Sequence, residues 1–381
     1  MSRDWDPSSR DVLSDQRVAY DRMREACPVA HDGAGTWTLF RHADVVAAAH
    51  DPATFSSQVS HHLTLPNGLD GAEHATYRAI VERYMTPQRV EALAPACHAI
   101  AAEVIASTPR HETFRAVALG TRYAVRAQSA WLGWPPQLED TLIQWMADNH
   151  AATRSGDHEL TAQVAERFDT IIRALLSHAR HTPGPGVTTE LLAERLAGRP
   201  LHEEEIVSIL RNWTAGDLGS IAVSFGVVVH FLASHPTVQG DLRAAARAGD
   251  RGAIATAVEE MLRIDDPFVA NRRVITRDVE VRGRTIPASD RVVLNWTAAN
   301  RDPRAFSDPE AFRPQVNAAH NLVFGTGPHA CPGRALSLME LAVITIELLI
   351  ATTRIDHAPG HSPVRETPPV GGWSFVPVLL S

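Results

Sequence analysis

A long apolar segment without an internal proline constrains the fold more than any other feature of this sequence. It runs from His202 to Ser234, and apolar residues cover most of its sides from Ile206 onward. A single helix of about 30 residues would span about 45 Å, enough to cross a whole domain. Because a helix that is apolar nearly all round is buried, we expect the other elements to pack around this segment.

Helical periodicity with frequent Ala and Leu also marks residues 88–180 and 202–264. A stretch rich in Pro and Gly, at 179–190, ends the first of these runs. Strand signals are fewer, and they lie near residue 37, at 279–287, at 291–296 and in the closing stretch FVPVLL. The sequence therefore predicts a mainly α protein with a minor β part, organised as a single domain over residues 1–381.

The charge and the cysteines narrow the class of protein. The net charge is −8, whereas a nucleic-acid-binding protein relies on a basic face. Cys27, Cys97 and Cys331 are too few and too scattered for a disulfide framework, which indicates a reducing compartment. The N-terminus lacks the pattern of a signal peptide, and no run of 18 or more apolar residues is found. We therefore expect a cytoplasmic protein that binds neither nucleic acid nor a membrane.

The segment FGTGPHACPG, residues 324–333, sets one cysteine among three glycines. Three interpretations compete: a nucleotide-binding loop, part of a zinc site, and a loop that offers one thiolate to a haem iron. The glycines do not have the spacing of a dinucleotide-binding loop, and no Gly-Lys-Ser/Thr of a phosphate loop follows. Zinc would need about four ligands in paired spacing, and neither Cys27 nor Cys97 has a partner nearby. These observations favour the haem interpretation.

The pattern F-x-x-G-x-x-x-C-x-G in this loop resembles the ligand loop of the cytochrome P450 family of haem-thiolate monooxygenases. Glycines let a backbone pass close to a sulfur and a porphyrin, and a helix beginning after the cysteine would direct its positive end at the thiolate. The resemblance implies the P450 fold, with the long central helix over the haem and the cysteine loop beneath it. It also implies haem b as cofactor, Cys331 as iron ligand, and haem contacts from Phe324, Gly325 and Gly333.

Two further segments resemble the same family. Glu260 and Arg263, in EEMLR, lie 71 and 68 residues before the cysteine and would share one helix face as an ion pair. Alone, such a pair is common on surface helices and contributes little, but its place in the chain implies a structural lock under the ligand loop. The segment ANRDPRAFSDPEAFRP resembles the family's meander. The family usually continues with an arginine where this chain has Val316, and either Arg313 or Asn317 is a candidate to replace it.

Four cationic or polar residues resemble the family's donors to the haem propionates. His74 and Arg78 lie one turn apart in EHATYRAIVERYMTP, Arg273 precedes a predicted strand, and His329 lies in the cysteine loop. Two propionates are costly to bury unpaired, so several donors are expected. Each residue alone would be interpreted as a surface charge, and their order along the chain favours the cofactor role.

The central helix departs from the family pattern Ala/Gly-Gly-x-Asp/Glu-Thr, whose acid and alcohol deliver protons to bound oxygen. Here the stretch is WTAGDLGSIAV, and two registers are possible. A literal match of AG puts Leu218 at the acid position and Gly219 at the alcohol position. The register that we prefer aligns Gly216 with the first position, which puts Gly219 at the acid and Ser220 at the alcohol.

Asp217 then lies one turn before Ser220 on the same helix face. A lone carboxylate in an apolar helix is costly unless it is paired or functional. Three interpretations stay open: a salt bridge or cap-like bond, a displaced acid that delivers protons with Ser220, and a contact to substrate. We take Asp217 and Ser220 as the catalytic candidates.

The resemblance implies a bacterial monooxygenase, typical of secondary metabolism, that inserts one oxygen atom from O2 into a small organic substrate by hydroxylation, dealkylation or a related oxidation. Because no reductase domain or flavin fingerprint is found, a separate ferredoxin or flavodoxin with its reductase is the expected electron donor. The altered acid–alcohol pair leaves two alternatives: a peroxide-driven or atypical P450 oxidation, and a haem-thiolate protein without catalysis.

The family's substrate-contact regions map to 59–67, to the helix around Asp217, to 267–271 and to 371–375. His61 and His62 in the first of these are interpreted as loop residues rather than pocket residues. The remaining stretches predict a partly apolar and aromatic pocket, formed by Trp213, Phe268, Val269 and Trp373.

Overall fold

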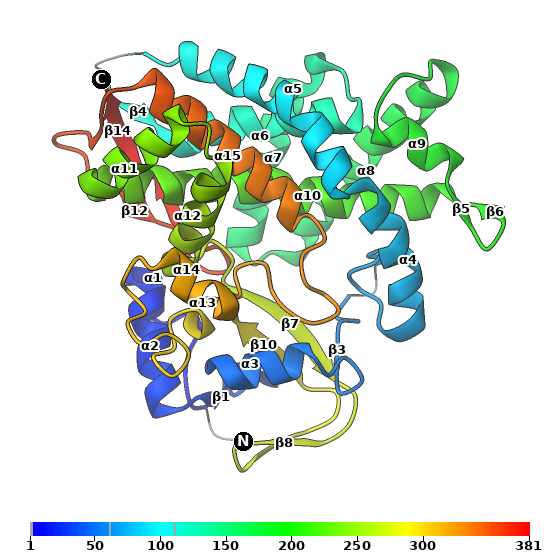
Figure 1. Ribbon diagram of the computed structural model, residues 1–381. Helices are drawn as coiled ribbons and strands as arrows, with labels where there is room; N and C mark the ends of the chain where they lie inside the picture. Colours follow the sequence, from blue (N-terminus) through cyan, green and yellow to red (C-terminus); the bar gives the residue numbers. More distant parts are fainter. Residues whose placement is uncertain (1–2, 61, 110–111) are drawn as a thin grey trace.

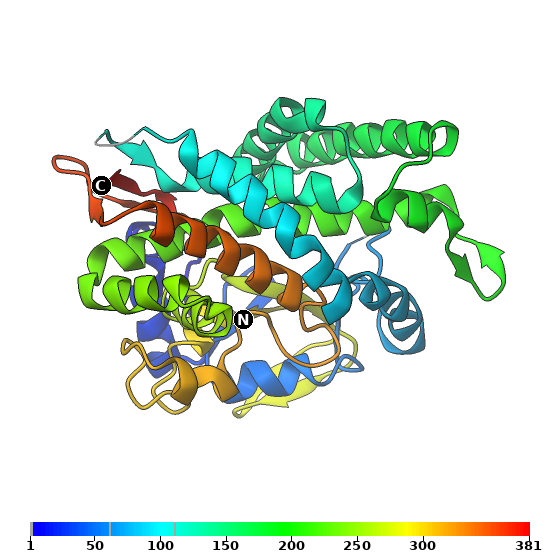
Figure 2. The same cartoon turned by 45° about the horizontal axis from the view of Figure 1, so that its top comes forward.

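The computed structural model describes residues 3–60, 62–109 and 112–381. It is mainly helical with a small sheet part, as the sequence predicts (Figure 1). Helix α10, Glu203–Ser234, passes through the centre and packs against α6, Ala116–Leu132, and α8, His158–His181. On another side α5, Pro87–Ala106, and α15, Arg334–Ala351, lie next to each other and cross it (Figure 2).

The local sequence explains both the start and the burial of α10. Three glutamates stand in its first turn, where the helix dipole favours negative charge. The carboxylate of Glu205 accepts a hydrogen bond of 2.6 Å from the backbone N–H of His202 and so caps the helix. The helix ends before Pro236, and its middle is apolar on most sides, with Leu210 and Phe225 at 0% exposure.

Although no run of 18 or more apolar residues occurs, α10 is long and apolar enough to cross a membrane by its length and mean hydropathy. In the described part of the chain it is the one helix that meets that standard, with a mean hydropathy of 1.6 over its most apolar window. However, 71% of that window is buried inside the protein. The hydropathy therefore reflects a central position in the core.

The other helices surround this centre. The predicted break at 179–190 is confirmed, because α8 ends at His181 and α9 begins at Val187. The remaining helices are α1 Arg10–Ser14, α2 Gln16–Ala26, α3 His42–Ala49, α4 Gly71–Tyr84, α7 Glu139–Ser155, α9 Val187–Ala193, α11 Pro236–Arg247, α12 Arg251–Ile264, α13 Trp296–Ala299 and α14 Pro314–Asn317.

The main sheet has the strand order β1-β2-β10-β7-β3 and lies in the lower half of Figure 1. Its strands β2 and β10 pair in parallel, and the other neighbours pair antiparallel. The strands predicted near residue 37 and at 279–287, 291–296 and the C-terminus are confirmed. The strands of this sheet are β1 Val29–His31, β2 Thr36–Leu39, β3 Phe55–Ser56, β7 Ala270–Ile275 and β10 Arg291–Asn295.

The small sheets are pairs or triplets of short strands. In the triplet, β14 pairs with β11 and with β4, which brings the C-terminal strand against the start of α6. The strands of the small sheets are β4 Phe114–Arg115, β5 Arg195–Leu196, β6 Arg199–Pro200, β8 Val279–Val281, β9 Arg284–Ile286, β11 Ile355–His357, β12 Val364–Arg365, β13 Trp373–Phe375 and β14 Pro377–Leu380.

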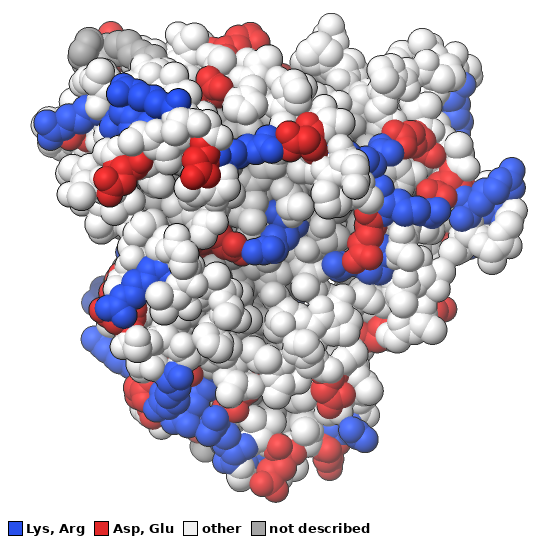
Figure 3. Space-filling model, viewed as in Figure 1, with Lys and Arg blue, Asp and Glu red and all other residues white. Residues whose placement is uncertain are grey.

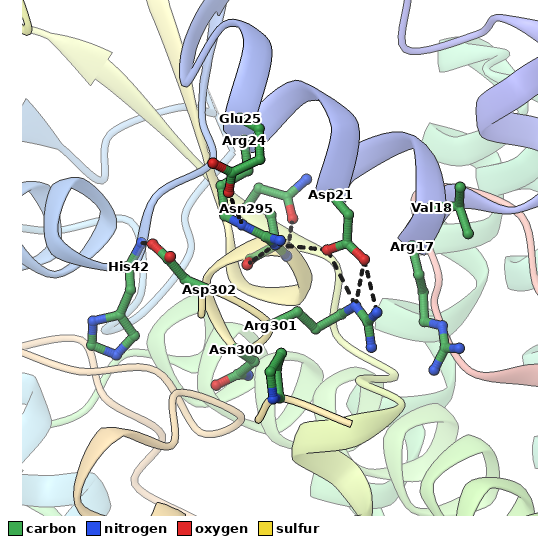
Figure 4. A network of polar contacts seen from close by, with 12 residues as sticks. Arg17, Val18, Asp21, Arg24, Glu25, His42, Asn295, Asn300, Arg301 and Asp302 are labelled. Atoms are coloured by element: carbon green, nitrogen blue, oxygen red, sulfur yellow. Dashed lines mark hydrogen bonds and ion pairs between the residues drawn. The ribbon is translucent and has the colours of Figure 1, made fainter. Parts of the chain in front are cut away.

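An arginine network fixes the N-terminal helix α2 to the segment around α13 (Figure 4). Arg301 donates to Asp21 at 2.7 Å, and Arg24 donates to Asp21 at 2.6 Å and to the carbonyl of Ala298 at 2.9 Å. Arg24 and Arg301 are largely buried. Removing Asp21 would therefore leave two buried charges without this partner. Over the outer face in Figure 3, acidic and basic side chains are mixed, and neither sign dominates.

Candidate active site

The glycine-rich loop holds its cysteine at the start of α15. The backbone N–H of Cys331 donates to the carbonyl of Phe324 at 2.8 Å, and α15 begins three residues later at Arg334. Gly327 has a φ of 74°, and a Cβ there would lie 2.5 Å from the carbonyl oxygen of Ala49. Only glycine fits this position. The loop therefore folds tightly and places the Cys331 sulfur near a helix N-terminus, where negative charge is favoured.

A cavity of about 550 Å³ separates this loop from α10. Cys331 lines one wall and is an exposed residue, although many protein atoms surround its sulfur. That burial raises the pKa of the thiol, and the backbone N–H of Gly333 lowers it. Asp217 and Ser220 line the wall formed by α10, together with Gly216 and Gly219.

The side of α10 that faces the cavity supports the register in which Ser220 takes the alcohol position. Ser220 lines the cavity. Leu218 is 1% exposed, packs in the main core, and is not among the described lining residues. The hydroxyl at 220 thus lies on the wall opposite Cys331, and the acid position at Gly219 carries no side chain.

A second buried acid, which the sequence analysis missed, lies close enough to Asp217 for their charges to interact. Oδ2 of Asp217 has no hydrogen-bond partner in the described chain, and burial raises the pKa of Asp217 to about 7. Glu340 of α15 is 1% exposed, and neither of its carboxyl oxygens has a partner among the described residues. Burial raises the pKa of Glu340, and the charge of Asp217 raises it further. The salt-bridge interpretation of Asp217 therefore finds no support, and both acids hold protons readily.

Two of the four expected propionate donors, His329 and Arg273, line the cavity, and a third, His74, packs against His329. His329 Nε2 lies 3.1 Å from both Asp70 Oδ1 and Ser57 Oγ, and its ring centroid is 4.1 Å from that of His74. His74 Nε2 is buried without a partner in the described chain. Burial, with the charges of His74 and Arg273, lowers the pKa of His329 to about 4.

Arg273 of β7 is a buried cation that has no acidic hydrogen-bond partner in the described chain. It is 7% exposed, and its one hydrogen bond in the described chain goes to the carbonyl of Arg272 at 2.8 Å. Burial lowers its pKa, and the nearby charge of Asp70 raises it. Such a buried cation is costly without an anion beside it. This end of the cavity therefore suits a ligand that carries carboxylates.

Arg78 differs from the other expected propionate donors because it pairs with an acid on its own helix. Its guanidinium binds Glu82 at 2.7 Å, one turn along α4, and it is not among the described residues that line the cavity. The i,i+4 spacing favours this pairing. The role of Arg78 as a direct propionate donor therefore stays a prediction, and in this structure its guanidinium is the partner of Glu82.

The predicted Glu260–Arg263 pair is present and fully buried. Arg263 donates to both carboxyl oxygens of Glu260 at 2.8 Å, and also to the carbonyl of Asn300 at 2.8 Å. The missing arginine is replaced by Asn317, whose Nδ2 donates to Glu260 Oε1 at 2.6 Å. Arg313 contributes its backbone N–H at 3.0 Å, while its guanidinium points toward Asp308.

Comparison with known proteins decides the family. A family model described as Cytochrome P450 matches residues 127–352, more than half of the chain. The chain belongs to the cytochrome P450 family. Among relatives of this P450, an erythromycin C-12 hydroxylase of Saccharopolyspora erythraea is 30% identical over 349 residues, covering 87% of this chain and 86% of the relative. A cyclomarin C epoxidase of Salinispora arenicola is 29% identical over 368 residues, covering 92% of each.

Solved structures agree with this assignment. A mutant of P450 EryK in complex with erythromycin B has a TM-score of 0.86 at 29% identity, covering 97% of both chains. Ligand-free cytochrome P450 TbtJ1 has a TM-score of 0.87 at 28% identity, covering 98% of this chain and all of the other. This P450 is therefore a haem monooxygenase of bacterial type, and its sequence-predicted fold is confirmed.

The residues of this P450 fit the haem that the family implies. The cavity offers one thiol, at Cys331, and the buried Arg273 in its lining has no acidic partner within hydrogen-bond distance in the described chain. His74, which packs against the lining residue His329, has a buried Nε2 without a partner there. Phe324, Gly325 and Gly333 also line it. A planar group with two carboxylates would satisfy these donors while its metal lies at the sulfur.

The expected substrate residues divide into two groups. Trp213, Phe268 and Val269 line the cavity, and Trp213 stacks near Trp131, with ring centroids 5.2 Å apart. Trp373 is not among the described residues that line the cavity. Its indole N–H donates to Asp265 Oδ2 at 2.5 Å, and the side chain therefore packs outside the cavity.

The loops of the substrate regions also differ from the expectation. From the C-terminal region, Pro369 and Val370 reach the cavity rather than 371–375. His62 is exposed, and it is not among the described residues that line the cavity. This agrees with its interpretation as a loop residue. His61 lies outside the described residues.

Helix α7 supplies a group of lining residues that sequence reasoning missed. Asn149, His150 and Thr153 reach the cavity from this helix. No family motif marks them, and the cluster of polar residues in one turn of an otherwise ordinary helix was the only available signal. Gln128 of α6 and Asn212 of α10 add amide groups to the same wall.

Proposed function

We propose that this P450 inserts one oxygen atom from O2 into a small organic substrate in the cytoplasm, as a single haem domain over residues 1–381. Its cofactor is haem b, and a separate ferredoxin or flavodoxin with its reductase supplies the electrons. One observation carries the proposal: Cys331 lies on one wall of the cavity, and Asp217 and Ser220 lie on the opposite wall.

The chain's residues have distinct tasks in this reaction. Cys331 would ligate the iron, and Arg273, His74 and His329 would bind the propionates. When bound, haem iron activates O2 and performs the oxidation. Asp217 has a pKa near 7, so its carboxyl group can donate a proton at physiological pH, and the Ser220 hydroxyl can pass it on.

The cavity wall indicates the class of substrate. Trp131, Trp213, Phe268 and Val269 provide an apolar surface. Amide groups are set into the same wall, from Asn67, Gln128, Asn149, Asn212 and Asn271. Such a surface suits a bulky apolar skeleton that carries hydroxyl or amide groups. The relatives named for erythromycin and cyclomarin C support this class.

A peroxide-driven reaction is the second candidate. It is favoured by Gly219, which leaves the acid position of the helix without a side chain. Hydrogen peroxide already carries the two electrons and two protons that O2 needs, so a site with weak proton delivery can use it.

Two measurements test the function. Reduction under CO should give the red-shifted Soret band of a haem-thiolate, and Cys331→Ala should abolish it; a wild-type spectrum without that band refutes the site. The protein is then assayed with macrolides and cyclic peptides, using either NAD(P)H with a surrogate ferredoxin and reductase, or hydrogen peroxide alone. Product with the electron-transfer partners supports the first proposal. Product from peroxide alone replaces it with the second.

Variants test the roles of the two wall residues. Asp217→Asn and Ser220→Ala should both lower the amount of product per NAD(P)H and raise peroxide release. Unchanged product per electron would refute these roles. Trp373→Phe serves as a control, because this side chain is packed away from the cavity.

A further inference from the structure

The side chain of His150 covers α10 where the helix carries a glycine beside Ser220. A Cβ built on Gly219 would lie 3.0 Å from His150 Nε2. This is closer than most real contacts of a Cβ, so the imidazole occupies the space that a side chain at 219 would need. His150 belongs to α7, lines the cavity and is half-buried.

The His150 side chain has a protonation state in which it can both accept and donate a proton. Burial lowers its pKa, the charge of Arg154 lowers it further, and that of Glu366 raises it. The imidazole is therefore neutral at pH 7, with one N–H donor and one free nitrogen. In the described chain neither ring nitrogen has a hydrogen-bond partner from the protein, so both are available to groups in the cavity.

The surroundings of Asp217 and His150 differ in their access to solvent. Among described lining residues, these two are the titratable side chains on the α10 side of the cavity. Glu340, whose pKa the charge of Asp217 raises, is buried and its carboxyl group is unpartnered, so no hydrogen-bonded side chains lead outward from it in the described chain. Behind His150, one turn along α7, lies Arg154, which pairs with Glu366 and has 38% of its side chain exposed.

We propose that His150 is a proton-transfer residue of this P450, which carries protons from water beside the partly exposed Arg154 to the cavity wall at Ser220. The inference rests on the proposed monooxygenase function. Inserting one oxygen atom consumes O2, two protons and two electrons and forms one water. The electrons come from the iron–sulfur or flavin partner, and the protons come from solvent. An imidazole that accepts a proton at one nitrogen and releases one from the other ends as the other neutral tautomer, and it returns to the first by exchanging protons with water or by a ring flip.

The first experiment tests the geometry without turnover. Gly219→Ala is introduced with His150 present and with His150→Ala, and the Tm of each haem-loaded protein is measured. The added methyl group should lower Tm when the imidazole is present and should lower it less, or not at all, when the imidazole is absent. An equal change in both backgrounds would show that His150 does not cover Gly219.

The second experiment tests the chemistry and needs no known substrate. NAD(P)H, surrogate ferredoxin and reductase drive O2 reduction, and the fraction of O2 reduced to water rather than to hydrogen peroxide is measured. His150→Ala and His150→Phe should each lower the rate of water formation about tenfold or more. The double variant His150→Ala/Gly219→Asp should regain most of it, because a carboxyl group then occupies the vacated space. His181→Ala, an exposed histidine at the end of α8, should leave it unchanged.

The outcomes separate this inference from the proposed function. A wild-type protein that lacks the haem-thiolate band with CO refutes the function itself. A wild-type protein that shows the band and forms water, while both His150 variants form it equally fast, refutes only the role of His150. Weaker binding of a substrate found in the macrolide and peptide assay, with water formation unchanged, would make His150 a substrate contact and would also overturn the proposal.

Discussion

Asn317 donates a hydrogen bond of 2.6 Å to the carboxylate of Glu260, which is also held by two hydrogen bonds of 2.8 Å from Arg263. The position that carries an arginine in the family pattern is Val316 here, and its side chain is 68% exposed. The third member of this buried lock has therefore moved by one residue and lost its charge. A neutral amide suffices because Arg263 already neutralises Glu260.

Asn317→Ala should lower the free energy of unfolding by about 1–3 kcal/mol, because it removes a donor to a buried carboxylate. Asn317→Asp should cost more, since it sets a second acid against Glu260. Urea unfolding followed by circular dichroism measures both. Val316→Ala is the matched control, with an expected change within about 0.5 kcal/mol. Equal stability of the Ala variant and the wild type would show that Asn317 is not part of the lock.

Haem retention should distinguish Arg273 from Arg78. Arg273 is buried without an acidic partner within hydrogen-bond distance, whereas Arg78 is paired with Glu82. Arg273→Ala should speed transfer of haem to a haem-scavenging protein by about tenfold, which corresponds to about 1.4 kcal/mol. Arg78→Ala should change that rate by about twofold or less. A larger effect at Arg78 would return it to the set of direct propionate donors.

Gly327→Ala should destabilise the ligand loop, because the new Cβ would lie 2.5 Å from the carbonyl oxygen of Ala49. Gly360 is a matched control: its φ is 76°, close to the 74° of Gly327, but a Cβ there meets nothing within 4 Å. Gly360→Ala should cost about 1 kcal/mol of backbone strain. Gly327→Ala should cost more and should lower haem content, measured by absorbance. Equal losses at the two sites would exclude the steric explanation.

Stability should depend on pH through Asp217. Its pKa is raised to about 7 by burial, whereas an unfolded aspartate titrates near about 3.9. Between these values the folded protein binds more protons than the unfolded chain, so this group's contribution to stability falls as pH rises from about 4 to 7. Asp217→Asn should therefore gain stability over wild type at pH 8, by on the order of a few kcal/mol, and little at pH 4.

Urea unfolding at pH 5, 6, 7 and 8 checks this difference. The exposed Asp241 provides the control, and Asp241→Asn should follow the wild-type curve. A gain that is constant across this range would mean that Asp217 does not change its protonation on folding. A loss of stability at pH 8 would mean that its negative charge is stabilised by the fold.

The proximal side of the site could be predicted from the sequence because it depends on short-range geometry. The spacing of glycines around Cys331, the helix after it and the i,i+3 spacing of Glu260 and Arg263 are fixed by covalent neighbours and helix periodicity. The long helix was also predictable, because a helix that is apolar on nearly all sides is buried in the core. The propionate donors near β7 and in the cysteine loop stay a prediction, which rests on their order along the chain.

Contacts between distant segments could not be predicted in this way. The Trp373 indole, expected in the cavity wall, instead donates a hydrogen bond to Asp265, which is 108 residues away in the chain. Glu340 and His150 carry no motif, and their significance depends on which helices pack together. Glu340 matters because its charge interacts with that of Asp217, and His150 matters because it lies over Gly219.

The sequence by itself determined the class of fold, the cysteine and the loop that presents it, because these follow from local spacing and from the burial of one long apolar helix. Only the tertiary structure decided what faces that cysteine. It brought the charges of Asp217 and Glu340 within reach of each other, made Asn317 the third member of the buried lock and laid His150 over Gly219. The physical reason is that each of these relationships joins residues from different helices or segments, whose approach is set by the packing of the whole core.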